Sequence, residues 1–205
     1  MKEKRIIFAA KVLSVIFTPF YLPLLGLAIL LAFTYLSLLP FMYKLLLLLA
    51  FWVFTVFVPT MLIRLYRRYQ GWTLFELGNR ERRVIPYVIS IASYLLCYYL
   101  MAAAHVPHFM GSILIAALVI QVACALVNIY VKISTHMAAI GGVAGALAAF
   151  SLIIGFNPLW WLCLVLIVAG LVGTSRMILR QHSLRDIVLG FLVGTVCSFA
   201  SVALL

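Results

Sequence analysis

The sequence predicts an all-α protein, a polytopic membrane bundle of six to seven transmembrane helices. Of its 205 residues, 67% are hydrophobic and only 9% are charged, and its mean hydropathy is +1.25. A soluble domain carries about 25% charged residues. A lipid-exposed backbone must satisfy its own hydrogen bonds, which a helix does within one segment, whereas a transmembrane barrel shows short alternating segments. We therefore expect a single integral-membrane domain over residues 1–205, with no internal boundary.

Seven apolar runs are long enough to cross the ~30 Å hydrocarbon layer. The first is overlong and contains Pro19 and Pro23, so it should kink or tilt. The fifth is short and rich in glycine and alanine, which leaves the count at six or seven. The stretch "GGVAGALAA" and the pair Gly190 and Gly194 suit close helix packing. The expected spans are 8–36, 43–63, 84–104, 111–131, 137–155, 159–175 and 185–205.

Basic residues concentrate on one side of this predicted topology. If there are seven spans, Lys44 alone of the 15 lysines and arginines falls on the opposite side. Cytoplasmic loops carry such an excess, so the basic face is predicted to be cytoplasmic, in a bacterial inner (plasma) membrane. Because the charges lie in short loops beside the spans, anionic membrane lipids are the expected partners rather than nucleic acid.

Three polar clusters fall on that basic side, and ionisable groups near membrane depth usually indicate function. They are "ELGNRERRVIP" (76–86), "NIYVKISTH" (128–136) and "SRMILRQHSLRD" (175–186). Only four acidic residues occur in the chain, which argues against a metal site and predicts no cofactor. A serine hydrolase is disfavoured because no G-x-S-x-G elbow is present.

Arginines beside two histidines and one aspartate suit an anionic phosphate substrate, since guanidinium groups bind phosphate oxygens as a fork. His182 and Asp186 are four residues apart and share a face if a helix begins there. The carboxylate would then accept from one ring nitrogen and leave the other as a nucleophile or base. His136 could protonate a leaving oxygen, and Arg176 could hold the phosphate oxygens.

The third cluster resembles a known signature. "SRMILRQHSLRD" matches S-R-x5-H-x3-D, the third motif of the type 2 phosphatidic acid phosphatase (PAP2) superfamily, at Ser175, Arg176, His182 and Asp186. The resemblance implies a metal-independent lipid phosphatase in which His182 forms a phosphohistidine, oriented by Asp186. It also implies that Arg176 and Ser175 belong to the phosphate-binding set.

The other two clusters resemble the remaining PAP2 motifs less closely. "ISTH" matches P-S-G-H at Ser134 and His136, with Thr135 in place of glycine. The resemblance implies phosphate binding at Ser134 and Thr135 and makes His136 the general acid. For K-x6-R-P, the best phosphate ligands are Arg83 and then Arg80, and Arg80 or Lys132 could supply the missing lysine's charge. The motif-bearing core covers about 76–190.

The expected substrate is a phosphomonoester or diphosphate on a membrane lipid, of the phosphatidate, phosphatidylglycerophosphate or prenyl diphosphate type. Its phosphate would react at head-group depth while its tails stay in the bilayer. Three alternatives stay open: an anionic-lipid transporter or flippase, an inactive family member, and a phosphotransferase. Arg180 and Arg185 are interpreted as facing lipid head groups, and the loop around His105 as solvated. The sequence makes no prediction of oligomeric state.

Overall fold

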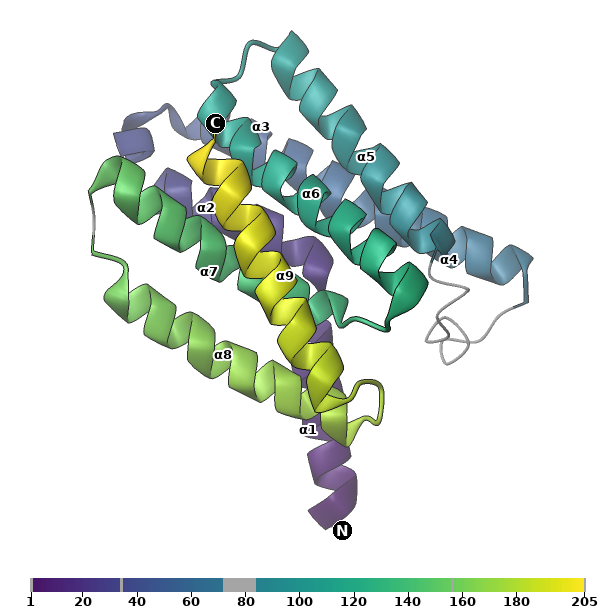
Figure 1. The fold of residues 1–205 in the computed structure, drawn as a ribbon. Coiled ribbons are helices and arrows are strands. Elements are labelled where there is room, and N and C mark those ends of the chain that lie inside the picture. The colour runs from purple at the N-terminus through teal and green to yellow at the C-terminus, as the bar shows by residue number, and fades with distance from the viewer. Residues whose placement is uncertain (1, 34, 72–83, 156, 205) are drawn as a thin grey trace.

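The structure, a computed structural model, describes residues 2–33, 35–71, 84–155 and 157–204. In these ranges the chain forms helices and connecting segments and contains no strand (Figure 1), which confirms the all-α prediction. The helices are α1 (Lys2–Ile16), η1 (Pro19–Tyr21), α2 (Leu22–Phe33), η2 (Tyr35–Leu38), α3 (Phe41–Trp52), η3 (Val53–Phe57, a π-helical turn), α4 (Val58–Tyr69), α5 (Val84–Ala103), α6 (His108–Tyr130), α7 (Thr135–Ile154), α8 (Leu159–Ile178) and α9 (Leu184–Ala203).

Within the described residues, seven helical stretches are long and apolar enough to cross a membrane, so the larger of the two predicted counts is confirmed. The second runs to Tyr69 rather than to 63, because the helix continues through Arg67 and Arg68 at its end. Such side chains extend to head-group depth and complement the helix dipole. The spans are Glu3–Ile29, Phe41–Tyr69, Val84–Ala103, Met110–Tyr130, Thr135–Ile153, Leu159–Ile178 and Leu184–Ala203.

The first span is broken where prolines were expected to break it. Thr18 is extended, with φ −61° and ψ 135°, and Pro19 begins a short 3-10 turn that leads into α2. A residue before proline avoids the helical region, so the helix cannot continue through Thr18. The break lets α1 pack along α8, while α2 packs against α6 and α7. The break therefore places the polar part of the first span, around Ser14, near the start of α7 and the end of α8.

Helices α7 and α9 form the closest pair in the bundle. A Cβ added at Gly141, Gly145 or Gly194 would meet a main-chain oxygen of the facing helix. The hydroxyl of Thr195 also donates to the carbonyl of Gly141 at 3.1 Å. The glycines predicted to serve packing therefore do so, and they bring the two motif-bearing helices into backbone contact.

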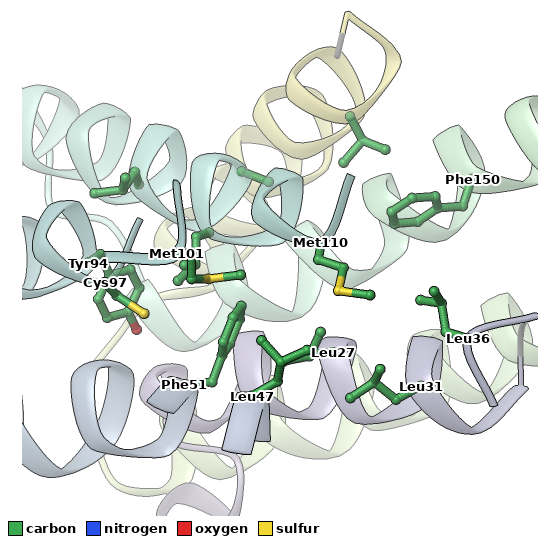
Figure 2. Close-up of a cluster of buried hydrophobic side chains, with 14 of the residues drawn as sticks. Leu27, Leu31, Leu36, Leu47, Phe51, Tyr94, Cys97, Met101, Met110 and Phe150 are labelled. Carbon is green, nitrogen blue, oxygen red and sulfur yellow. The ribbon is translucent and has the colours of Figure 1, made fainter. Parts of the chain in front are cut away.

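A hydrophobic cluster joins residues of α2, α3, α5 and α6 with Ala149 and Phe150 of α7 and Val202 of α9 (Figure 2). Leu27, Phe51, Tyr94 and Leu114 are fully buried there. Tyr94 and Phe150 of this cluster also line a pocket that lies between α2, α5, α6 and α7.

The turn after α8 reverses the chain without glycine. Arg180 has φ 53°, its N–H donates to Met177 O at 2.9 Å, and Gln181 N–H donates to Arg176 O at 3.1 Å. This pair of bonds is a Schellman cap, in which the left-handed position usually holds glycine. The turn sets the direction in which the chain enters α9.

Replacing Arg180 with glycine should stabilise the protein by about 0.5–1 kcal/mol, because glycine adopts this conformation without a Cβ penalty. The expected rise in unfolding temperature is about 1–4 °C, measured by thermal unfolding in detergent. Arg180→Ala is the matched control, since it removes the same side chain but keeps the strain. Equal stability of the glycine and alanine variants would contradict the explanation.

Candidate active site

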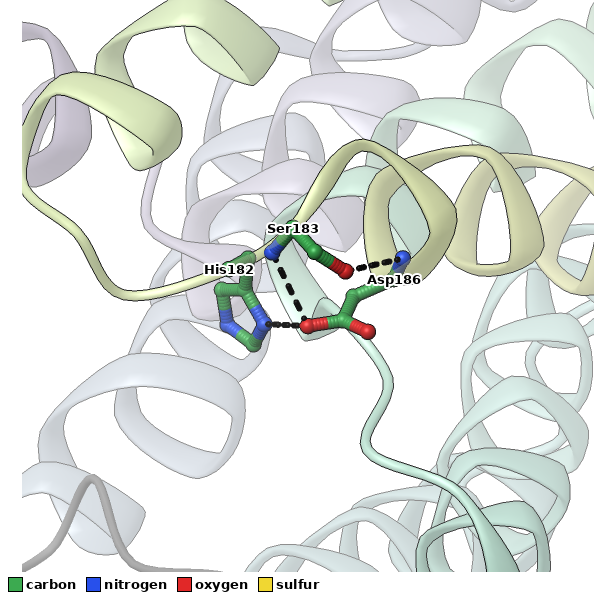
Figure 3. A network of polar contacts seen from close by, with 3 residues as sticks. All are labelled: His182, Ser183 and Asp186. Carbon is green, nitrogen blue, oxygen red and sulfur yellow. Dashed lines mark hydrogen bonds and ion pairs between the residues drawn. The ribbon is translucent and has the colours of Figure 1, made fainter.

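The third motif spans the end of α8 and the start of α9. Ser183 is the N-cap of α9, and its hydroxyl accepts from Asp186 N–H at 3.3 Å. The Asp186 Oδ2 atom in turn accepts from Ser183 N–H at 3.1 Å (Figure 3). This reciprocal pair is a capping box, which satisfies two N–H groups at the helix start. Asp186 is thereby fixed in place by its own helix.

His182 lies beside this fixed carboxylate. Its Nδ1 atom is 3.4 Å from Asp186 Oδ2, and its side chain is only 1% exposed. The separation exceeds the usual 2.9–3.0 Å of an N–H···O bond. With Nδ1 facing the carboxylate, Asp186 orients the His182 ring. The sequence prediction that these two residues share a face is confirmed.

The second motif meets the third through the backbone. Ser134 N–H donates to Asp186 C=O at 3.2 Å, and Ser134 caps the start of α7. Its side chain is completely buried, yet its hydroxyl makes no hydrogen bond within the described ranges. Buried hydroxyls normally have partners. Ser134 therefore offers a hydroxyl for a polar ligand.

Ser14 of α1 connects two further candidates, and sequence reasoning missed it. Arg176 Nη1 donates to its hydroxyl at 2.7 Å. His136 Nε2 lies 3.1 Å from its carbonyl oxygen, which places the proton on Nε2. The only signal in the sequence is a hydroxyl within the apolar run of the first span. No motif includes it.

His136 and Arg176 line the polar end of a pocket of about 530 Å³, whereas Ser134, His182 and Asp186 do not line it. That end is lined by Thr135, His136, Arg176 and Gln181, whereas the walls come mainly from apolar faces of α2, α5, α6 and α7. The N-terminus of α1, the end of α8 and the start of α9 lie at the same end of the bundle, in the lower part of Figure 1.

The remaining candidates are less central. The Ser175 hydroxyl donates to Val172 O in its own helix at 2.7 Å, and Ser175 lines a different depression, between α1 and α8. Lys132 is half-buried in the segment before α7. Arg80 and Arg83 lie outside the described residues. Arg180 and Arg185 are exposed, in keeping with their interpretation as head-group contacts.

The arrangement suits a tetrahedral oxyanion. Arg176 supplies a guanidinium, Ser134 a buried hydroxyl, and the start of α7 its N–H groups, which favour anions. The ring of His182, oriented by Asp186, is the candidate nucleophile, and His136 carries a proton on Nε2. Among the described residues, no group of three His, Cys, Asp or Glu side chains is placed to hold a metal ion.

Comparison with known proteins agrees with the two C-terminal motifs. The family model of the PAP2 superfamily matches residues 123–205, which include both of them. No curated protein and no solved structure matches the chain. The superfamily match indicates phosphatase activity on phosphate esters. The first-motif region, 76–86, lies outside the matched range. Residues 123–205 of this integral membrane protein are therefore similar to the PAP2 superfamily.

Proposed function

We propose that this protein hydrolyses a phosphate ester or diphosphate of a membrane lipid, without metal, through a phosphohistidine at His182. The observation that carries the proposal is the meeting of the two C-terminal motifs through the Ser134–Asp186 bond, near the polar end of a pocket among membrane helices. A site in that position suits a substrate with a charged head and an apolar tail.

The first chemical step is attack of His182 Nε2 on phosphorus, which forms a P–N bond and breaks the P–O bond to the lipid. Asp186 holds the proton on Nδ1 and stabilises the cationic ring. His136, which starts the cycle protonated on both ring nitrogens, gives its Nε2 proton to the departing lipid oxygen and becomes neutral. Arg176 and the Ser134 hydroxyl bind the non-bridging oxygens, where negative charge is held.

The second step returns the enzyme to its starting state. A water attacks phosphorus, and His136, now neutral at Nε2, takes one of its protons as the P–N bond breaks. Inorganic phosphate leaves, and His182 Nε2 recovers its lone pair. Proton and charge therefore balance over the cycle, and no metal or cofactor enters it.

Purified protein in detergent, with EDTA present, tests the reaction. Phosphatidate, phosphatidylglycerophosphate and a prenyl diphosphate are offered, and release of inorganic phosphate is measured. The proposal requires EDTA-resistant release from at least one of them, inhibited by vanadate, which mimics the five-coordinate phosphorus. No release from any of the three, or release that EDTA abolishes, would contradict it.

Ser14→Ala should lower kcat/KM for phosphate release about five-fold. The reason is that Arg176 loses a 2.7 Å hydrogen bond, and one such bond contributes about 1 kcal/mol net. Ser14→Thr, which keeps the hydroxyl, should retain the wild-type value. If the alanine and threonine variants behave alike, the hydroxyl has no part in positioning Arg176.

We also propose that the site opens on the cytoplasmic face of a bacterial inner membrane, because the basic residues gather at that end. A cysteine at Gln70, which is exposed at the end of α4, should react with an impermeant maleimide only in inside-out vesicles. A cysteine at His105, exposed between α5 and α6, should react only in right-side-out cells. The opposite pattern would place the site outside.

A further inference from the structure

The pocket extends from the proposed site far into the bundle. On α7, Ala139, Val143, Ala146 and Phe150 follow His136 along one face and all line it. At a rise of ~1.5 Å per residue, His136 to Phe150 covers about 21 Å. That length exceeds the depth of one membrane leaflet, about half of the ~30 Å hydrocarbon layer.

Its walls are mainly apolar along that length, and Ser90, Gln121 and Ser198 are the polar side chains that also line it. Ile113, Ala117, Ile120 and Cys124 line it from α6, and Gly26 and Ile29 line it from α2. Because α6 and α7 run in opposite directions, Cys124 lies near the polar end and Ile113 near the far end. One end therefore carries Arg176 and His136, and the rest offers no charged side chain from the lining residues.

The size of the pocket suits one alkyl chain. About 530 Å³ accommodates a chain of 16 to 18 carbons, at ~30 Å³ for each methylene-sized group.

We propose that this pocket binds the single apolar chain of the substrate inside the protein, and that the preferred substrate is a single-chain lipid phosphate. The inference rests on the proposed function for the position of the phosphate, beside Arg176 and His136. It replaces the sequence-based expectation that the tail stays in the bilayer during the reaction.

A bulky residue part-way along the pocket tests the proposal. Ala146→Phe should lower kcat/KM at least ten-fold for a lysophosphatidate with an 18-carbon chain. It should leave a six-carbon alkyl phosphate within two-fold of wild type. Ala92→Phe is the matched control, because Ala92 is exposed on α5 and does not line the pocket. Equal effects of Ala146→Phe on both chain lengths, or no effect on either, would overturn the tail site.

Wild-type protein should also turn over lysophosphatidate at least ten-fold faster than phosphatidate of the same chain length, at equal mole fraction in detergent micelles. A preference for the two-chain lipid would overturn the single-chain assignment.

A binding experiment separates this inference from the catalytic one. A 16-carbon alkyl phosphate with a diazirine at its chain end is photolysed on the full-length protein, and the adducts are mapped by mass spectrometry. Adducts at Ile113, Ala117 or Phe150 support the tail site. Adducts confined to bilayer-facing residues such as Leu96 or Leu126 overturn it. Cross-linking requires no turnover. A protein that releases no phosphate would therefore contradict the proposed reaction, while the adducts would still test the tail site.

Discussion

Replacing His182 with alanine should reduce EDTA-resistant phosphate release by about 10⁴-fold or more. A nucleophile that forms the covalent intermediate cannot be replaced by neighbouring groups, and loss of such a residue has effects of this order. His182 also lies within a connected set. The carbonyl oxygen of its partner Asp186 accepts from Ser134 N–H, which links the third motif to the second.

The experiment must separate lost chemistry from lost structure, because the His182 side chain is only 1% exposed. His182→Gln fills a similar volume and should be equally inactive, while both variants keep the wild-type elution position in detergent. The intermediate gives a direct measurement: rapid quenching of wild type with ³²P-labelled lipid should yield a protein-bound label that acid removes and alkali does not. Folded His182→Gln that still releases phosphate would end the phosphohistidine proposal.

Asp186 carries a second role that complicates any test of it. Its carboxylate caps α9 and faces His182 with the same oxygen, Oδ2. Asp186→Ala would remove both the cap and the orienting group. Asp186→Asn keeps an oxygen for Ser183 N–H, so it separates the helix cap from the effect on the His182 ring.

The sequence was most informative where a pattern has a local physical cause. Seven long apolar runs predicted the helices, and Pro19 predicted the break in the first span. The spacing of His182 and Asp186 predicted their contact, which the structure shows. The sequence "SLRD" also contains a capping-box pattern, with serine at the N-cap and an acid three residues on, and the structure forms this capping box.

What the sequence could not show depends on contacts between distant segments. Ser14 reaches Arg176 across 162 residues and His136 across 122, and nothing local to Ser14 indicates either partner. The pocket likewise arises from four helix faces, each of which looks like ordinary bundle core when taken alone. Ser175 shows the reverse case: it fits the motif, yet its hydroxyl is bonded to Val172 O within its own helix.

Gly194→Ala should cause the largest loss of folded protein. An added Cβ would meet the main-chain oxygen of Ala138 on α7, and a backbone atom cannot rotate away as a side chain does. Overpacking typically costs 1–3 kcal/mol, and a clash with backbone should lie at or above about 3 kcal/mol. The measurement is the fraction that elutes as a single species in detergent, together with its unfolding temperature. Gly170→Ala on α8 is the control, because a Cβ there meets nothing within 4 Å and alanine favours the helix by about 1 kcal/mol.

The same substitution tests how the site is held together. If α7 and α9 must separate to admit the new Cβ, the 3.2 Å bond between Ser134 N–H and Asp186 O should lengthen as well. Any folded fraction of Gly194→Ala should therefore lose phosphate release, although Gly194 lies two helical turns from Asp186. At Gly142 the added Cβ meets only the flexible Cδ1 of Ile120, so Gly142→Ala combined with Ile120→Val should fold and retain more activity than Gly194→Ala. If Gly194→Ala instead folds and reacts like wild type, close α7–α9 contact is not what brings the two motifs together.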